Sequence, residues 1–283
     1  MELMVFSKHL TGLPLSEVGR RLAEMDIHAI DLTVRPGGHV DPERVEQDLP
    51  RAAEDLAQSG VRIGMITTAI TEANALARRI LAMAVQVGIR HYKLGYYNYK
   101  GFGTLKTQRA EVAAKLKELA ALNAESGIHG GFHNHSADFF GASLWDIAYV
   151  LEGTPRAALG LYFDPAHAHI EGGSDGWLMG MDLLQDRLSM LAVKDYYWAK
   201  AGRGYGGGRQ HAAQWCPLEE GNTPWPEVLR CLLRINFEGP ISLHSEYQGA
   251  HSFRDLSVDE VFNQTARDAA LFKTWIEKAA ENK

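Results

Sequence analysis

The sequence contains only two cysteines, Cys216 and Cys231, and they are not spaced as a CxxC pair. Two thiols without disulfide or metal spacing are typical of a reducing compartment, so we expect a cytoplasmic protein. Positive charge is not in excess: 29 Lys and Arg stand against 35 Asp and Glu, and the net charge is −6. Because affinity for nucleic acid comes largely from neutralising phosphates with a basic face, we expect no nucleic-acid partner.

Long apolar runs are missing as well. No span of 18 apolar residues occurs, and the first residues, MELMVFSKHL, lack the basic and apolar regions of a signal peptide, so we expect no membrane partner. The chain has no low-complexity linker and no short-period repeat. With 283 residues, 46% of them hydrophobic, it is long enough to bury a large core, and we treat residues 1–283 as one domain.

Short β-rich runs alternate with amphipathic helical patterns along the whole chain. In one helical stretch, Leu76, Ile80, Met83 and Val87 recur at spacings of three and four. A regular alternation of this kind predicts parallel strands covered by helices. The predicted strands are 3–7, 28–33, 61–68, 90–95, 128–134, 159–164, 190–195 and 240–247.

Eight strand–helix units in this length fit a (β/α)₈ TIM barrel, which typically needs about 250 residues. A doubly wound open sheet is the alternative. That fold usually carries a glycine-rich phosphate fingerprint after its first strand, and VFSKHLTGLPL has none. We therefore predict a single-domain α/β barrel.

Polar residues alternate with apolar ones near the predicted strand ends. Since helices cover the outside of a barrel, the apolar set faces outward and the alternate set faces the axis. Barrel enzymes keep their active sites at the C-terminal strand ends, where this rule gathers ionisable groups. The inward polar set is Lys8, Asp31, Thr68, Lys93, His129, His133, His135, Tyr162, Asp164, Lys194, Ser242, His244 and Glu246.

Several of these residues also have a purely structural interpretation. Asp164 precedes a proline and is placed to cap the following turn, and Lys93 or Lys194 can serve as an ion-pair partner of an inward aspartate. His167 lies in FDPAHAHIEGG, which we interpret as a loop over the pocket, where solvated histidines are common. Glu246 is the hardest to explain structurally, because an inward carboxylate at a strand end has little packing value.

A second long loop is predicted at about 196–222, between the seventh strand and its helix, and its length suits a lid. Its GRGYGGGRQH segment lacks the GxxxxGK[ST] pattern of a phosphate loop. Arg209 and His211 in this segment are predicted to contact an anionic or polyhydroxyl substrate.

The segments FHNHS, FDPAHAHIEGG, AVKD, CPLEEGNTPWPEVL and EGPISLHSEY resemble, in strand order, the xylose isomerase-like TIM-barrel family. This family contains sugar isomerases, epimerases and inosose dehydratase, and its members typically bind a divalent metal at the barrel mouth. The resemblance implies that Asp164 and Glu246 are metal ligands and that His167 contacts substrate. Two positions depart from the family pattern: His133 stands in place of a glutamate, and Ala192 in place of a histidine.

The resemblance implies a metal-dependent isomerase or epimerase that moves a proton next to the carbonyl of a sugar, cyclitol or similar small molecule. Mn²⁺, Mg²⁺, Co²⁺ or Zn²⁺ would be held by Asp164, Glu246 and His133. Glu246 would move the proton, and His133 or Lys194 would serve as the second acid/base. His135 and Lys93 would bind the substrate. The open alternatives are a dehydratase, a Schiff-base enzyme using a lysine, and a non-catalytic carbohydrate-binding barrel. A homo-oligomer is compatible with all of them.

Overall fold

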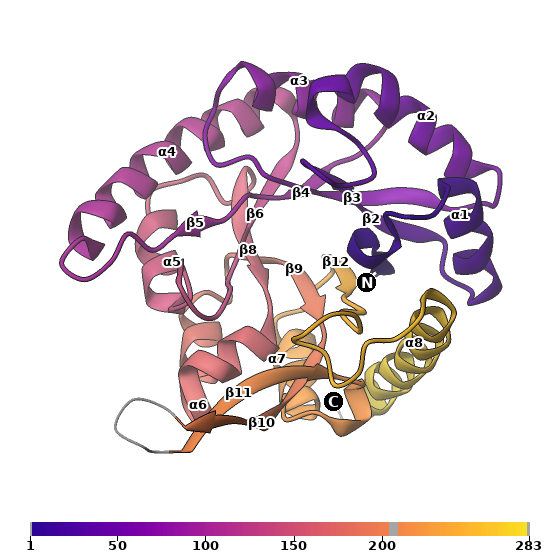
Figure 1. Cartoon of the computed structure of the whole chain (residues 1–283). Helices are drawn as coiled ribbons and strands as arrows, with labels where there is room; N and C mark the ends of the chain where they lie inside the picture. Colours follow the sequence, from indigo (N-terminus) through magenta and orange to yellow (C-terminus); the bar gives the residue numbers. More distant parts are fainter. Residues whose placement is uncertain (1, 204–208, 282–283) are drawn as a thin grey trace.

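Eight parallel strands pair around a closed barrel in the computed structural model, which describes residues 2–203 and 209–281 (Figure 1). Each strand pairs with the next one in the barrel, and the last pairs with the first, so the predicted TIM barrel is confirmed. In barrel order the strands are β1 (Glu2–Phe6), β2 (Ala29–Val34), β3 (Arg62–Thr68), β4 (His91–Lys93), β6 (His129–His133), β8 (Leu159–Phe163), β9 (Leu188–Val193) and β12 (Pro240–Leu243).

Helices surround the strands as an outer ring (Figure 1). Asp41 accepts a hydrogen bond from the backbone N–H of Glu43 and caps the 3-10 turn Pro42–Arg44 before α2, and Asn74 accepts one from Ala77 and caps α3. The helices are α1 (Leu15–Glu24), α2 (Val45–Ala57), α3 (Ala75–Gln86), α4 (Leu105–Ser126), α5 (Leu144–Leu151), α6 (Pro165–Leu183), α7 (Trp225–Arg234) and α8 (Val258–Glu281). No helix of the described chain is long and apolar enough to cross a bilayer.

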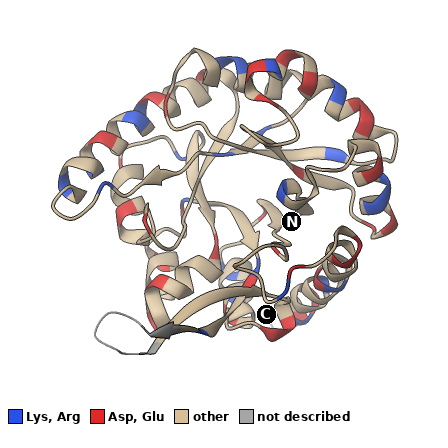
Figure 2. Cartoon of the chain, viewed as in Figure 1, with Lys and Arg blue, Asp and Glu red and all other residues tan. Residues whose placement is uncertain are grey.

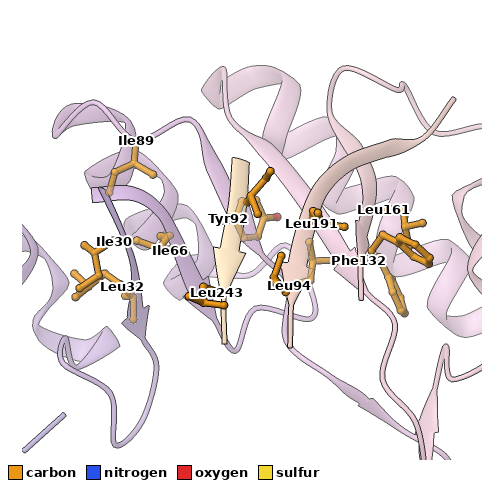
Figure 3. Close-up of a cluster of buried hydrophobic side chains, with 14 of the residues drawn as sticks. Ile30, Leu32, Ile66, Ile89, Tyr92, Leu94, Phe132, Leu161, Leu191 and Leu243 are labelled. Carbon is orange, nitrogen blue, oxygen red and sulfur yellow. The ribbon is translucent and has the colours of Figure 1, made fainter. Parts of the chain in front are cut away.

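The main hydrophobic core lies between the strands and the helices. Figure 3 labels residues of this layer, including Ile30, Tyr92 and Leu161, each with no exposed surface. A second, smaller cluster fills the barrel interior, and it consists of Met4, Ala29, Met65, Tyr162, Met190 and Ala192. Because apolar side chains fill this interior, the inward polar groups are left at the C-terminal mouth.

One predicted inward residue is wrong. Thr68 donates a hydrogen bond to the backbone oxygen of Lys93, whereas Thr67 faces inward and donates to Asp31 at 2.8 Å. The cause is a register shift at Gly64, which places one extra residue of β3 opposite β2. A bulge of this kind reverses the alternation of the residues that follow it.

The segment predicted as a loop at about 196–222 is largely a β-hairpin. Its strands β10 (Asp195–Arg203) and β11 (Arg209–Cys216) are antiparallel, with Tyr196 opposite Trp215. The aromatic residues Tyr196, Tyr197 and Trp198 on one arm and Trp215 on the other favour strands, and the glycine-rich run between the arms obscured that preference. A smaller unpredicted sheet joins β5 (Tyr97–Asn98) to β7 (Phe139–Phe140) beside the mouth.

Asp195 anchors this hairpin to α7. Its carboxylate accepts hydrogen bonds from the backbone N–H groups of Tyr196 and Thr223, at 2.8 and 2.9 Å, and from the indole N–H of Trp225 at 3.0 Å. Burial raises the pKa of Asp195 to about 6, so the side chain is a charged acceptor at neutral pH.

Replacing Asp195→Ala is expected to lower the free energy of unfolding by about 3 kcal/mol, because three buried donors lose their acceptor. Urea denaturation at pH 7 measures this change. The exposed Asp175 on α6 provides the matched control, and Asp175→Ala is expected to change the stability by less than about 0.5 kcal/mol. Equal stability of the two variants would contradict the anchoring role.

Candidate active site at the barrel mouth

A pocket of about 90 Å³ lies at the C-terminal end of the barrel. Figure 2 shows most charged residues on the outer helices, and fewer inside the ring. The charged residues that line the pocket are four basic side chains and one carboxylate. The lining residues are Phe6, Lys8, Arg35, Lys93, Tyr96, His133, His135, Lys194, His244 and Glu246.

Asp164 sits at the end of β8 behind this pocket and is fully buried. Its Oδ1 accepts a hydrogen bond from the backbone N–H of His167, so it caps α6. Its Oδ2 lies 3.3 Å from His133 Nε2 and 3.4 Å from Lys194 Nζ. Asp164 therefore serves both roles that the sequence left open, as a helix cap and as a partner of inward groups.

His167 lies in the first turn of α6 and not in a loop, because Asp164 and Pro165 start the helix at that point. Its Nε2 is 2.7 Å from Lys194 Nζ. On the other side of the ring, the hydroxyl of Ser136 is 2.7 Å from Nδ1. Both ring nitrogens are thus within hydrogen-bond distance of a partner, and Nε2 can accept a hydrogen bond from the Lys194 ammonium group.

Lys194 connects the two acids of the site. Its Nζ is 3.4 Å from Asp164 Oδ2 and 3.9 Å from Glu246 Oε1. It also lies 4.1 Å from the centre of the Trp215 ring, which comes from β11. The side chain is 3% exposed, so its charge is held between two carboxylates under an aromatic cover.

Glu246 follows β12 and faces the pocket. Its Oε2 is 3.5 Å from Lys8 Nζ. Burial alone would raise the pKa of Glu246, but the charges of Lys194 and Lys8 outweigh it and hold the pKa well below its usual range. Glu246 is therefore a carboxylate at neutral pH.

His133, at the end of β6, is a neutral imidazole at neutral pH. Burial, followed by the charge of Lys93, lowers its pKa well below the ordinary value. Its Nε2 faces the Oδ2 of Asp164 at 3.3 Å. The Nδ1 of His244 is buried and makes no hydrogen bond within the described chain, so this atom is suited to a hydrogen bond with a bound ligand.

The three predicted metal ligands do not form a fitting donor set. His133 and Asp164 approach each other, but the Nζ of Lys194 lies between Asp164 and Glu246. The inward position of Ala192 offers no donor atom. Across residues 2–203 and 209–281, no three His, Cys, Asp or Glu side chains are grouped as ligands for a metal ion. A divalent ion beside Lys194 would meet a like charge in a buried setting, so these residues do not fit the metal that the family resemblance implies.

The predicted substrate-binding residues fall into two groups. His135 and Lys93 line the pocket, and the rings of His135 and His167 have centres 3.9 Å apart. His211 is exposed on β11 and is not among the lining residues, because the strand carries it along the hairpin. The prediction for the side chain of Arg209 lies outside what the structure describes.

Sequence analysis missed Phe6, Arg35 and Tyr96 in the pocket wall. Arg35 follows β2 by one residue and shares the inward alternation of Asp31 and Thr33. If the alternation of inward and outward side chains had been continued past the predicted strand end at residue 33, it would have identified Arg35 as inward. Tyr96 follows the short strand β4, where the alternation has already ended, and gave no such signal.

Burial lowers the pKa of nine of the twelve histidines, for His91 and His135 to about 4. The same effect raises the pKa of three buried aspartates, Asp31, Asp195 and Asp268, to about 6. The other histidines concerned are His9, His39, His129, His133, His167, His169 and His244.

We expect the free energy of unfolding to fall by about 3 kcal/mol or more between pH 7 and pH 5. As the pH drops through 6.5, histidines in the unfolded chain take up protons that the buried ones do not, so folding loses stability. The aspartates act in the opposite direction but are outnumbered. Urea denaturation at the two pH values measures the difference, and equal or greater stability at pH 5 would contradict the expectation.

Comparison with known proteins places this geometry in a family. The model of the xylose isomerase-like TIM barrel matches residues 20–266. A search of curated protein sequences found no match to the chain.

Solved structures with the same fold include a D-tagatose 3-epimerase-like protein, with a TM-score of 0.71, 16% identity, and coverage of 100% of this chain and 99% of the other. A probable 3-DHS dehydratase from Bacillus anthracis has a TM-score of 0.68, 12% identity and coverage of 96% and 98%. A xylose isomerase-like protein from Mycobacterium smegmatis, crystallised with magnesium, has a TM-score of 0.70, 14% identity and coverage of 98% and 97%. Because the family model spans most of the sequence, the chain belongs to the xylose isomerase-like TIM barrel family.

Proposed function

We propose that this protein is an isomerase or epimerase that moves a proton next to the carbonyl group of a sugar, cyclitol or related hydroxy-carbonyl compound. The observation that carries the proposal is the placement of Lys194, Glu246 and His133 on the wall of one pocket, with Asp164 buried behind them and in contact with Lys194 and His133. A base, a neutral imidazole and a fixed positive charge are the groups that such a proton transfer needs.

The barrel order supports a two-sided transfer. Glu246 follows β12 and His133 ends β6, and these strands are separated by β8 and β9. The two side chains therefore reach the pocket from different directions. In the proposed mechanism Glu246 removes the proton from the carbon beside the carbonyl. The protonated Glu246 then returns this proton to the neighbouring carbon, and the neutral His133, as the second acid/base, takes the proton of the adjacent hydroxyl group and gives it to the carbonyl oxygen.

Lys194 takes the electrostatic role in this mechanism. Its ammonium group would face the carbonyl oxygen, where negative charge develops as the proton leaves. Its contact with Nε2 of His167, at 2.7 Å, holds the ammonium group in place. No step requires a metal ion, in keeping with the poor fit of the donor set.

A dehydratase is the second candidate. It would use the same proton abstraction, followed by loss of the hydroxyl group on the next carbon with the help of His133 or Lys194. The probable 3-DHS dehydratase among the solved structures of this fold supports keeping this reaction in view. A non-catalytic carbohydrate-binding barrel, the third candidate, would bind ligands and exchange no protons.

Exchange of carbon-bound hydrogen in D₂O tests the proposal. We expect the protein to incorporate deuterium next to the carbonyl of at least one compound in a panel of ketoses, aldoses, ketocyclitols and their acidic derivatives. Glu246→Gln is expected to lower the exchange rate by about 10²–10⁴-fold, because the base is lost. The exposed Glu118 supplies the control, and Glu118→Gln should keep the full rate. Exchange unaffected by the Glu246 variant would contradict the proposed base.

The role of Lys194 predicts that chelation leaves the activity intact. Exchange or turnover by the wild-type protein is expected to stay within twofold after dialysis against EDTA, and added Mn²⁺ is expected not to increase it. Lys194→Met is expected to lower the rate by about 10²–10³-fold, since the charge that faces the oxygen is lost. Loss of activity in EDTA and its recovery with Mn²⁺ would show that a metal, and not Lys194, supplies that charge.

A further inference from the structure

The pocket wall carries more positive charge than its acids neutralise. Lys8, Arg35, Lys93 and Lys194 line the pocket, and Glu246 is the one carboxylate among the described lining residues. Glu246 lies within 4.0 Å of Lys8 and of Lys194, which also contacts Asp164. In the described part of the chain, no acidic side chain lies within that distance of Arg35 or Lys93. Arg35 and Lys93 are therefore left without an acidic partner in direct contact, and the buried Asp31 acts on both from a longer distance.

Lys93 is the more buried of the two. It is 2% exposed, and its Nζ donates a hydrogen bond to the backbone oxygen of Leu94 at 2.9 Å and lies 3.6 Å from the centre of the Tyr96 ring. Both partners are uncharged. Burial, followed by the nearby charge of Arg35, lowers the pKa of Lys93 to about 7. The protein thus holds a buried amine beside another cation, and an anion between them would relieve that cost.

Arg35 is half-buried at the same side of the mouth. Its guanidinium carbon lies 5.7 Å from the centre of the Phe6 ring, which supports the side chain without neutralising it. A guanidinium group presents two parallel N–H donors that match the two oxygens of a carboxylate or a phosphate. Arg35 is therefore able to orient an anionic group as well as to attract it.

The barrel order separates these two cations from the reactive groups. Arg35 follows β2 and Lys93 ends β4, the two strands that flank β3. Lys194 follows β9, which is four strands away from β3 in either direction around the eight-stranded barrel. A ligand whose anionic end lies over β2–β4 extends its other end toward Lys194, Glu246 and His133.

We infer that the substrate carries a carboxylate or phosphate group, and that Arg35 and Lys93 bind this group so that the hydroxy-carbonyl end reaches Lys194 and Glu246. The inference rests on the proposed function for its reactive end only. Recognition of the anion follows from the unpaired cations, and it can be measured without turnover.

Three compounds with three carbons each test this inference by titration calorimetry. Dihydroxyacetone is neutral, dihydroxyacetone phosphate carries a phosphate, and hydroxypyruvate carries a carboxylate. We expect at least one of the charged compounds to bind the wild-type protein at least tenfold more tightly than the neutral one, and the tighter of the two identifies the anionic group. The advantage is expected to shrink as the salt concentration rises.

Arg35→Ala is expected to weaken binding of the preferred anion at least tenfold and to leave binding of dihydroxyacetone unchanged. Arg35→Lys keeps the charge but not the two parallel donors. Its affinity for the preferred anion is expected to lie between those of the wild type and of Arg35→Ala. Arg51, exposed on α2, supplies the control, and Arg51→Ala removes one positive charge without any effect on binding. Thermal unfolding of each variant verifies that it is folded.

Equal affinity for the charged and neutral compounds, or an Arg35→Ala variant that binds the anions as tightly as the wild type, would overturn the inference. So would a borohydride-trapped adduct of a carbonyl compound on Lys93, because the amine would then serve the carbonyl carbon. Anion binding that depends on Arg35 but is accompanied by no hydrogen exchange would support this inference while overturning the proposed function.

Discussion

The positive charge of Lys194 lies between two carboxylates at the mouth of the barrel, and the rest of the site is arranged around it. Asp164 and Glu246 come from strands on either side of β9, so the closed barrel brings both acids to the lysine. Burying such a cluster is costly unless every charge has a partner, and removing one partner typically costs about 3–5 kcal/mol. Lys194 already balances the charges of Asp164 and Glu246. A second cation between these two acids would therefore be repelled by the lysine.

The surrounding structure holds Lys194 in this place. Asp195, the next residue, is bonded to the start of α7, and the hairpin that follows places Trp215 over the lysine. His167 is fixed by the first turn of α6, which Asp164 caps. One short stretch of chain thus sets both the acid and the imidazole that contact the lysine. The family fold supplies the frame, and Ala192, two residues before Lys194, adds no donor atom beside the lysine.

Much of the fold and part of the site could be predicted from the sequence. The alternation of strand and helix patterns fixes a barrel, and the period of two along each strand identifies Asp164, Lys194 and Glu246 as inward. The failures have physical causes. A bulge at Gly64 reverses the phase of β3, so that Thr67 and not Thr68 faces Asp31. The distances among side chains from different strands depend on barrel closure and register, which no local pattern encodes. The position of Lys194 between Asp164 and Glu246, the acids that the family resemblance implies as metal ligands, could therefore not be predicted.

Anomalous diffraction from crystals soaked in Mn²⁺ tests the central claim most directly. The account predicts no anomalous peak within coordination distance of Asp164 and Glu246, and clear density for the Lys194 side chain between them. A manganese peak bound to both carboxylates, with Lys194 displaced, would contradict it.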